Sequence, residues 1–439
     1  MLTDKNPTHN VLIIGAYGLI GHGVSMRLIA DGYSVTGLGR NVQTARRVLA
    51  GVPWIERDMR MLCGEDSWDA ILDEFSTVVN CSGALQDGPD DDLEAIHHHA
   101  VTALAKACKA KDVALIQISA VGATTDASTH FLASKGRGDA SIRALMGKWH
   151  IFRPGLVLAS NAYGGTTLLR MLAAFLGFQP LATPNAKIQT VALDHVADAV
   201  AAAIKGELPY GFEADLVESE THTLREIIAQ IRNWLGFRPA RFEFVVPAFG
   251  VAVVSKLADA LSRFGWRSPM RSTSVKVLSE GVCGTPTDLS KFGLSPPRSL
   301  KQTLSNFPVG AQDRLFARMA LLFPIILFCL SLFWLTSGII GVVRLKEAAK
   351  VLQSVGWSAG LAMTSVLFWA VVDIAVGVAF AFRKSAKMAC WAAVGVSVFY
   401  LFASTFTVPS LWADPLGPLV KVVPAIVLAL VARATLDTR

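Results

Sequence analysis

Long apolar runs in the last third of the chain limit its fold more than any other feature. Hydrophobic residues make up 52% of the 439 residues and charged residues only 17%, whereas soluble domains carry about a quarter charged residues. Residues 1–312 mix charged and apolar residues in the ordinary way, and the apolar excess begins near Met319. Because some 20 apolar residues cross a bilayer as a helix, the sequence predicts that the carboxyl-terminal part lies in lipid.

The apolar part predicts four membrane spans, of which the fourth is short and contains Lys421. An even number of spans returns the carboxyl terminus to the side on which the chain starts. The amino terminus lacks a signal-peptide pattern, so we expect a multi-pass protein of the cell (inner) membrane with its first domain in the cytoplasm. Positive flanks agree only in part, because Arg344 and Lys346 would lie outside. The predicted spans are Met319–Val343, Trp357–Phe382, Met388–Val408 and Leu416–Ala432.

Two further features concern the bilayer. Asp373 lies inside the second span, where an ionisable group is costly; it is a functional candidate, and the alternative is a pairing with another polar group. Residues 247–271 mix apolar and basic side chains. They fit a helix on a membrane surface, and the alternative is a lid over the substrate cleft.

Charged and ligating residues limit the other partners. The formal net charge is +7 without a compact Lys/Arg tract, so we expect no nucleic acid and a surface facing anionic lipid. The six cysteines form no close pair, so neither a disulfide framework nor a metal site is expected. The run His97–His99 cannot chelate one ion, because consecutive helical residues point about 100° apart. We expect it to pack or to make a polar contact near the cofactor.

The first part of the chain alternates short apolar strands with helices such as Leu19–Ala30, Leu93–Ala110 and Phe131–Met146. This alternation predicts an α/β fold with a doubly wound parallel sheet. Beyond Pro154 the pattern loosens, and a small α+β region should supply the substrate side of a cleft. The predicted strands are Val11–Gly15, Tyr33–Leu38, Trp54–Asp58, Thr77–Cys81, Val113–Ser119 and His150–Arg153.

Three glycines stand where the first predicted strand turns into the first helix. Gly15 permits the tight turn, Gly18 lets the backbone approach a pyrophosphate, and Gly21 lets the helix pack closely on the sheet. The helix amino terminus offers N–H groups and a partial positive charge to phosphates. The predicted phosphate-binding residues are Gly15, Tyr17, Gly18, Leu19, Ile20 and Gly21.

The end of the second predicted strand bears on the choice of dinucleotide. NAD-binding folds usually place an acid there, whereas this chain has Arg40, with Arg46 and Arg47 nearby. Guanidinium groups suit a 2′-phosphate, so the sequence favours NADP, with NAD as the alternative. Asp58, after the third predicted strand, is placed to reach the adenine edge, unless it only caps a turn.

These motifs resemble the short-chain dehydrogenase/reductase superfamily, in its extended or atypical branch, over residues 11–205. The resemblance implies an NAD(P)-binding Rossmann fold. It also implies that Cys81, Ser82 and Gly83 line the nicotinamide side, and that Pro154 belongs to the cofactor site. Besides the glycine turn, the matching segments are Val79–Gly83, Ile118–Gly122, Phe131–Asp139, Phe152–Gly155 and Val191–Asp198.

The same resemblance implies catalytic roles. Ser119 lies near the family's catalytic serine, although the register could place that role on Ala120. Lys135 would bind the nicotinamide ribose and lower the pKa of a tyrosine one helical turn earlier. That earlier residue is Phe131, which has no proton to give, so the general acid of carbonyl–alcohol chemistry is absent from its expected place.

Three alternatives stay open. The domain binds NADP without catalysis, as members of the branch resembling a complex I accessory subunit do. It reduces a quinone-like or flavin-like acceptor without needing a tyrosine. Or another group, such as Tyr163 or His130, supplies the proton.

The carboxyl-terminal part resembles the DoxX-like family over residues 315–435, in its helix pattern and in Trp412–Lys421. That family is loosely associated with membrane redox chemistry. The whole chain therefore predicts a membrane-anchored NADP-dependent oxidoreductase with a lipophilic, quinone-like acceptor. The alternative is a non-catalytic NADP-binding subunit that regulates or assembles partner proteins of a membrane complex. The expected parts are a Rossmann domain at 1–154, the substrate-side region at 155–305, a linker at 306–316 and a four-helix transmembrane bundle at 317–439.

Overall fold

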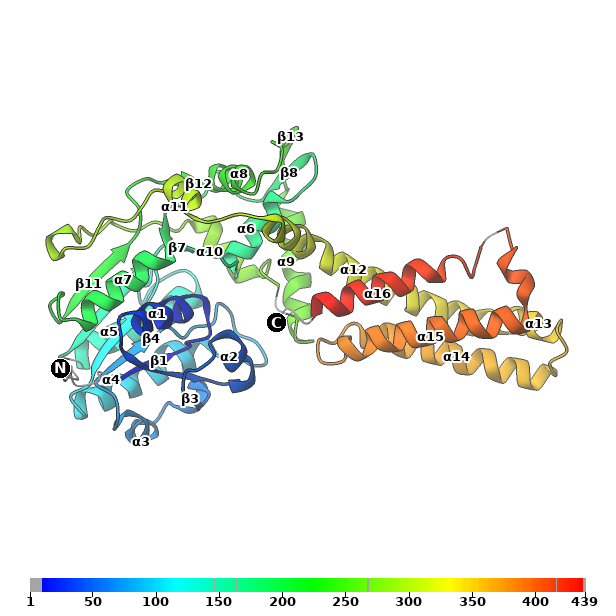
Figure 1. Ribbon diagram of the computed structural model, residues 1–439, viewed down its shortest axis with the longest axis horizontal. Coiled ribbons are helices and arrows are strands. Elements are labelled where there is room, and N and C mark those ends of the chain that lie inside the picture. The colour runs from blue at the N-terminus through cyan, green and yellow to red at the C-terminus, as the bar shows by residue number, and fades with distance from the viewer. Residues whose placement is uncertain (1–9, 146, 163, 267, 416, 437–439) are drawn as a thin grey trace, which may run out of the picture. The chain divides into compact units, whose positions relative to one another are not determined.

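The computed structural model describes residues 10–145, 147–162, 164–266, 268–415 and 417–436. The chain forms two compact units (Figure 1). The first comprises Met1–Lys256 and Pro269–Arg314, and the second comprises Leu257–Ser268 and Leu315–Arg439.

A seven-stranded parallel sheet forms the centre of the first unit, in the order β11-β6-β5-β4-β1-β2-β3. The chain runs outward from β1 to β3 in one direction and from β4 to β11 in the other. The order therefore reverses between β1 and β4, where doubly wound folds bind their ligands. The strands are β1 (Asn10–Ile14), β2 (Ser34–Gly39), β3 (Trp54–Glu56), β4 (Thr77–Asn80), β5 (Ala114–Ile118), β6 (Trp149–Pro154) and β11 (Phe212–Leu216).

Helices bury both faces of this sheet. Val11 and Ile13 belong to the core beneath α1 and α7, whereas Leu12 and Ile14 belong to the core beneath α4. This alternation follows the two-residue period of a strand, and burial on both faces explains why β1 is wholly apolar after its first residue. The helices and turns here are α1 (Leu19–Ala30), α2 (Val42–Val48), η1 (Met59–Met61), η2 (Glu65–Ser67), α3 (Asp69–Leu72), η3 (Ala95–His99), α4 (Ala100–Ala110), α5 (His130–Leu145) and α7 (Leu193–Ile204).

The doubly wound parallel sheet predicted from the sequence is confirmed. The seventh strand, β11, was not predicted, because Glu213 and Asp215 interrupt its apolar pattern. Both acids form ion pairs with Arg153 on the neighbouring strand β6, at 2.6 and 2.7 Å, so the charges are compensated only by tertiary structure. The helix predicted over 93–110 begins with a π-helical turn, η3, before α4.

The remaining elements of the first unit form three two-stranded sheets, β10-β7, β12-β9 and β13-β8, with helices around them. Helix α8 begins with a capping box between Thr223 and Glu226. The elements are β7 (Leu156–Leu158), α6 (Gly165–Ala173), β8 (Phe178–Leu181), β9 (Lys187–Ile188), β10 (Thr190–Ala192), β12 (His222–Thr223), α8 (Leu224–Trp234), β13 (Phe242–Val245), α10 (Ser272–Glu280), η4 (Ser290–Phe292) and α11 (Leu300–Asn306). Helix α9 (Ala248–Ser262) belongs to the first unit up to Lys256 and to the second unit from Leu257.

The second unit is all-helical, as predicted. Among the described residues, α12, α14 and α15 are long and apolar enough to cross a membrane. The fourth predicted span contains α16, whose 14 residues are shorter than the 20 or so that a perpendicular span requires. The helices are α12 (Ala311–Val343), α13 (Leu345–Gln353), α14 (Ala359–Ala379), α15 (Ala386–Thr407), η5 (Pro409–Trp412) and α16 (Val422–Thr435). The start of α12, up to Arg314, belongs to the first unit.

Small residues and one carboxylate bring the spans together. A Cβ on Gly338 of α12 would lie 2.5 Å from the carbonyl oxygen of Ala370 on α14, so only glycine permits this approach. Nearby, the buried Asp373 accepts hydrogen bonds from Ser337 of α12, at 2.8 Å, and from Tyr400 of α15, at 2.7 Å. Such contacts replace the hydrophobic driving force, which is absent between helices in lipid.

We predict that Gly338→Ala lowers the melting temperature of the detergent-solubilised protein by several degrees. Overpacking of this kind costs about 1–3 kcal/mol, and the added methyl meets backbone atoms, which cannot rotate away. Gly395→Ala on α15 is the matched control, because a Cβ there meets nothing within 4 Å. Equal shifts of the melting temperature for the two variants would contradict the close approach of α12 and α14 at Gly338.

Candidate functional site

The turn after β1 needs glycine at two of its three positions for reasons internal to the fold. Gly15 has φ +73° and donates its N–H to the carbonyl of Leu38, at 2.9 Å. A Cβ on Gly21 would lie 2.3 Å from the carbonyl oxygen of Gly15. Gly15 and Gly21 therefore set the turn and the close packing of α1.

Gly18 is different, because the fold restricts this position less than it restricts Gly15 and Gly21. Its φ of −73° and ψ of 173° suit any residue, and an added Cβ would meet only the Gly15 oxygen, at 3.2 Å. Gly18 is the N-cap of α1, yet no side chain caps the helix and its first turn carries no acid. The uncapped N–H groups and the open space in front of Gly18 form a site that an anion can approach.

The neighbours of Gly18 divide between this site and the core. The Tyr17 ring covers Gly39 at the end of β2, where a Cβ would lie 2.4 Å from the ring, and it packs 6.0 Å from Trp54 between ring centroids. Leu19 and Ile20 open α1, and Ile20 packs against the core beneath that helix.

Arg40, directly after β2, is held by acidic groups. Its Nη2 lies 2.8 Å from Asp91 Oδ1, and its Nη1 donates to the carbonyl of Asp90. A 2′-phosphate at this place has to compete with the Asp91 carboxylate for the guanidinium.

Asp58 caps the η1 turn, accepting from the Arg60 N–H at 3.0 Å and pairing with its guanidinium at 2.7 Å. Burial raises the pKa of Asp58, but the bonds from Arg60 outweigh it and leave the pKa below its usual value. The geometry thus agrees with the turn-capping alternative for this residue.

The segment after β4 meets the glycine turn. A Cβ on Gly15 would lie 3.1 Å from both the Cys81 carbonyl oxygen and the Ser82 Cα. Ser82 is fixed by Asn80, whose Oδ1 accepts from its N–H at 3.1 Å and from its hydroxyl at 2.6 Å. Burial raises the pKa of the Cys81 thiol to about 12. The thiol therefore stays protonated and uncharged and is not a nucleophile.

His97 supports the same segment, a contact that sequence analysis placed only near the cofactor. Its Nε2 accepts from the Ala84 N–H at 3.1 Å, so its Nδ1 carries the proton shared with Ser134 Oγ at 2.9 Å. Burial lowers the pKa of His97 well below its usual value, so the ring stays neutral. Gly83 lies close by, since a Cβ there would be 3.4 Å from Nε2.

The other two histidines of the run lie near Glu94. Ligand atoms of Glu94, His98 and His99 come within 4.8 Å of one another. The Glu94 carboxylate is already paired with Arg137, at 2.5 Å. The Arg137 bonds lower the pKa of Glu94 to about 2 against the opposing effect of burial. Because Arg137 already neutralises the Glu94 carboxylate, we interpret Glu94, His98 and His99 as part of an ion-pair network and not as metal ligands.

Ser119 and Lys135 are both buried, and a Cβ on Gly83 would lie 3.7 Å from Lys135 Nζ. Ser119 Oγ donates to Asp139 Oδ2 at 2.6 Å, and Lys135 Nζ donates to the carbonyl of Ile118 at 3.1 Å. Burial lowers the pKa of Lys135 and raises that of Asp139 to about 6, although the Ser119 bond opposes the latter. Asp139 was not singled out from the sequence. Its position one turn after Lys135 was the available signal.

The described residues that could substitute for the missing tyrosine do not offer a proton at its place. Lys135 Nζ lies 5.9 Å from the centre of the Phe131 ring, and the Ser119 proton is directed to Asp139. His130 is paired with Asp87 at 2.9 Å, on a side of α5 about 100° from Phe131. Tyr163, the other substitute considered, lies outside the described residues. Ala120, the alternative to Ser119, carries only a methyl group.

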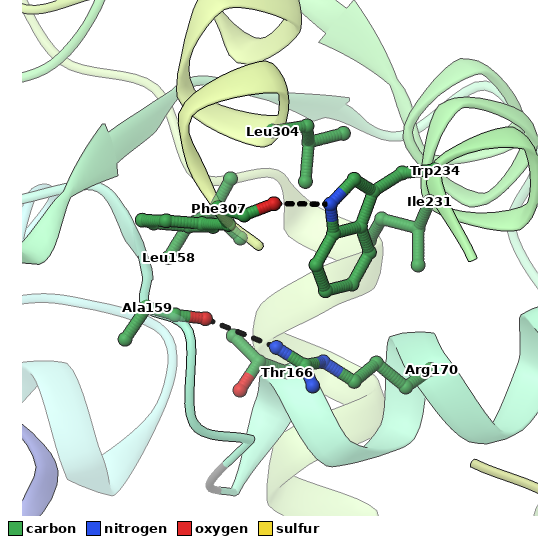
Figure 2. A pocket seen from close by; sticks show the side chains of 8 residues that line it. All are labelled: Leu158, Ala159, Thr166, Arg170, Ile231, Trp234, Leu304 and Phe307. Atoms are coloured by element: carbon green, nitrogen blue, oxygen red, sulfur yellow. Dashed lines mark hydrogen bonds between the residues drawn. The ribbon is translucent and has the colours of Figure 1, made fainter. Parts of the chain in front are cut away.

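The region after β6 carries a small cavity. Pro154 ends β6, is buried, and its carbonyl accepts from the Val121 N–H at 3.3 Å. Figure 2 shows the cavity, whose volume of about 10 Å³ holds at most one water molecule. It is too small for an organic substrate. Its lining residues are Leu158, Ala159, Thr166, Arg170, Ile231, Trp234, Leu304 and Phe307.

Comparisons with known proteins agree with both halves of this description. Residues 11–135 match the NAD dependent epimerase/dehydratase family, and residues 331–430 match the DoxX-like family. The predicted extended short-chain dehydrogenase/reductase domain followed by a DoxX-like domain is thereby confirmed for these segments. No curated protein matches the chain.

Solved structures share the fold of the first unit. Thermus thermophilus UDP-glucose 4-epimerase in complex with NAD has 19% identity and a TM-score of 0.50, over 68% of this chain and 98% of that one. The Bordetella bronchiseptica enzyme WbmG in complex with NAD has 17% identity and a TM-score of 0.51, over 70% and 94%. A Staphylococcus aureus nucleoside-diphosphate-sugar epimerase has 17% and 0.50, over 68% and 100%. These likenesses concern the fold alone.

We predict that Asp139→Asn stabilises the protein more at pH 7.5 than at pH 4.5. The folded pKa of about 6 exceeds the usual 3.8, so the folded state loses stability as pH rises between these values, by up to about 3 kcal/mol. Asparagine carries no charge at either pH and escapes this loss. Thermal unfolding of both proteins at each pH measures the difference, and a difference that does not change with pH would contradict the prediction.

Proposed function

We propose that this chain, an extended short-chain dehydrogenase/reductase domain joined to a DoxX-like domain, is a membrane-anchored NADP-dependent oxidoreductase. Its substrate is a lipophilic, membrane-associated acceptor such as a quinone. The observation that carries the proposal is Gly18, whose backbone suits any residue while the space before it is open to an anion. A pyrophosphate at the uncapped start of α1 accounts for that space.

The residues fit a nicotinamide dinucleotide bound across the switch between β1 and β4. Gly18 would hold the diphosphate, and Ser82, Gly83 and Lys135 would hold the nicotinamide side of the cofactor. Arg40 favours NADP, because a 2′-phosphate provides two negative charges in exchange for the single charge of Asp91. NAD is the alternative if the Arg40–Asp91 pair stays closed.

Quinone reduction suits a site without a tyrosine. The bound dinucleotide supplies a hydride, and the overall reaction converts NADPH, a quinone and one proton into NADP⁺ and a quinol. The acceptor oxygen can take its proton from water, so no side chain at position 131 has to supply it. Phe131 then offers an apolar surface to a lipophilic ring, and Lys135 binds the ribose.

The membrane part would hold this site near its substrate. A lipophilic acceptor concentrates in the bilayer, so a domain tethered there meets it at a higher local concentration. We propose a multi-pass protein of the cell (inner) membrane with the first unit in the cytoplasm. Basic residues near the start of α12, and between the end of α14 and the first turn of α15, support this orientation. They are Arg314, Arg318, Arg383, Lys384 and Lys387.

A second function is favoured by the bond between Ser119 and Asp139, which occupies the serine proton. With this bond and with phenylalanine at position 131, the domain would bind NADP without turnover. Such a module would regulate or assemble a membrane complex, with binding of the dinucleotide as its signal.

We predict that Gly18→Val weakens NADPH binding by at least about tenfold, because the side chain occupies the phosphate site. Fluorescence titration of the full chain in detergent measures the dissociation constant, and the melting temperature shows that the fold is retained. Wild-type protein that binds neither NADPH nor NADH would refute both proposed functions.

The same titration tests the choice of dinucleotide. Arg40→Ala should weaken NADPH binding by roughly tenfold, the value of one charge-assisted hydrogen bond, and leave NADH binding unchanged. Asp91→Asn is the matched variant and should tighten NADPH binding, since it removes the competing carboxylate. If Arg40→Ala weakened the binding of NADPH and NADH equally, Arg40 would not distinguish the two dinucleotides, and both NAD and NADP would be assigned to the site.

We predict that the purified protein in detergent oxidises NADPH when a short-chain quinone is added, and that Phe131→Tyr does not increase this rate. Quinone reduction needs no acid at this position, whereas carbonyl reduction does. Absorbance of NADPH follows the reaction. Tight binding of NADPH without turnover on quinone or carbonyl acceptors, in both proteins, would select the non-catalytic function. A gain confined to carbonyl acceptors in Phe131→Tyr would show a disabled reductase.

A further inference from the structure

Exposed apolar side chains of the first unit gather at one place. Leu176 is 77% exposed and Phe249 is 81% exposed, values otherwise expected of charged residues. Large exposed apolar patches of this kind mark interaction surfaces. We call this set the apolar edge. It consists of Leu176, Phe242, Phe244, Val245, Phe249 and Val253.

Contacts between β13 and β8 join most of the apolar edge, and α9, which carries Phe249 and Val253, follows β13 after two residues. Strand β13 pairs in parallel with β8, and the ring of Phe178 on β8 lies 6.0 Å from those of Phe242 and Phe244. Upstream of β13, Arg241 donates its N–H to the carbonyl of Gly177, next to Leu176. Every residue of β13 is exposed.

The segments that carry the apolar edge follow α6 and α8, and the same two helices hold the start of α12. Arg170 of α6 pairs with Asp313 in the first turn of α12, at 3.2 Å, and lies over the ring of Trp234 on α8 (Figure 2). Trp234 in turn donates to the carbonyl of Phe307, at 3.2 Å. The predicted linker is therefore fixed at both ends of residues 307–313.

A second arginine links the carboxyl-terminal ends of α6 and α8. Arg232 of α8 donates to the carbonyl of Ala173, the last residue of α6, at 2.9 Å, and to that of Arg238 at 2.6 Å. Leu176 follows Ala173 by three residues, and β13 follows Arg238 by four. The two helices that hold the start of α12 therefore also hold the segments that lead to Leu176 and to β13.

The charges around the apolar edge suit anionic lipid. Residues 236–256 contain Arg238, Arg241 and Lys256 against a single acid, Glu243. Glu243 is itself paired with Arg225, at 3.0 Å. Apolar side chains surrounded by cations are typical of protein segments that insert into the headgroup layer.

We propose that the apolar edge inserts into the headgroup region of the bilayer that α12 enters, and that it is the lipid-binding surface of the first unit. The lipid is chosen over a protein partner because the chain enters lipid from the same pair of helices. This inference does not depend on the identity of the dinucleotide or on catalysis.

The test uses full-length protein in liposomes, labelled with an environment-sensitive fluorophore at Phe249→Cys or Leu176→Cys. The background variant replaces the exposed Cys63, Cys283 and Cys329 by serine. Met61→Cys is the matched control, because Met61 is 76% exposed and lies outside the apolar edge. We expect brominated lipids to quench the label at 249 and 176 several-fold more than at 61. Arg241→Glu should reduce this quenching in liposomes containing phosphatidylglycerol.

Two outcomes would overturn the proposal. In one, labels at 249 and 176 respond to lipid quenchers no more than the label at 61 and remain open to iodide in water. In the other, they are shielded from iodide without lipid quenching, which would make the apolar edge a contact with protein. Retained thermal stability of each variant shows that the label reports on a folded chain.

Discussion

The first unit depends on the close packing of α1 against the turn that follows β1. Gly21 lies so near the carbonyl of Gly15 that no side chain fits between them, and Gly15 in turn lies against the segment after β4. These two contacts bring the start of a helix and the ends of two strands to one point. The open space at Gly18 exists only because its neighbours are packed in this way. A binding site here is thus a direct result of how the sheet reverses direction.

Periodicity accounts for what the sequence predicted well. Strands such as Val11–Gly15 are buried on both faces, so their apolar runs are uninterrupted, and α1 was predicted with its observed ends. Local pattern could not predict β11, because Glu213 and Asp215 are compensated by Arg153 from a distant part of the chain. The same holds for the candidate site. The glycines were visible as a motif, whereas the pairing of Arg40 with Asp91 and of Ser119 with Asp139 depends on loops that meet only in the folded protein.

The second unit follows a different logic. Its helices expose apolar side chains outward, so burial of apolar surface cannot decide which helices pair. Gly338 decides it by permitting backbone contact, and Asp373 by accepting hydroxyls from two neighbouring helices. The sequence revealed Asp373 as an anomaly but not its partners, which lie 36 and 27 residues away. A pairing with polar groups, one of the two alternatives for this residue, is what its surroundings provide.

The fixed segment before α12 has a mechanical consequence. Asp313, in the first turn of a continuous 33-residue helix, is bonded to Arg170 on α6. A helix longer than the hydrocarbon layer tilts to fit it, and the tilt depends on bilayer thickness. In a chain whose α12 spans the bilayer, the bonds of Arg170 to Asp313 and of Trp234 to Phe307 would pass such a tilt on to α6 and α8. The thickness of the surrounding membrane would then act as a force on these two helices.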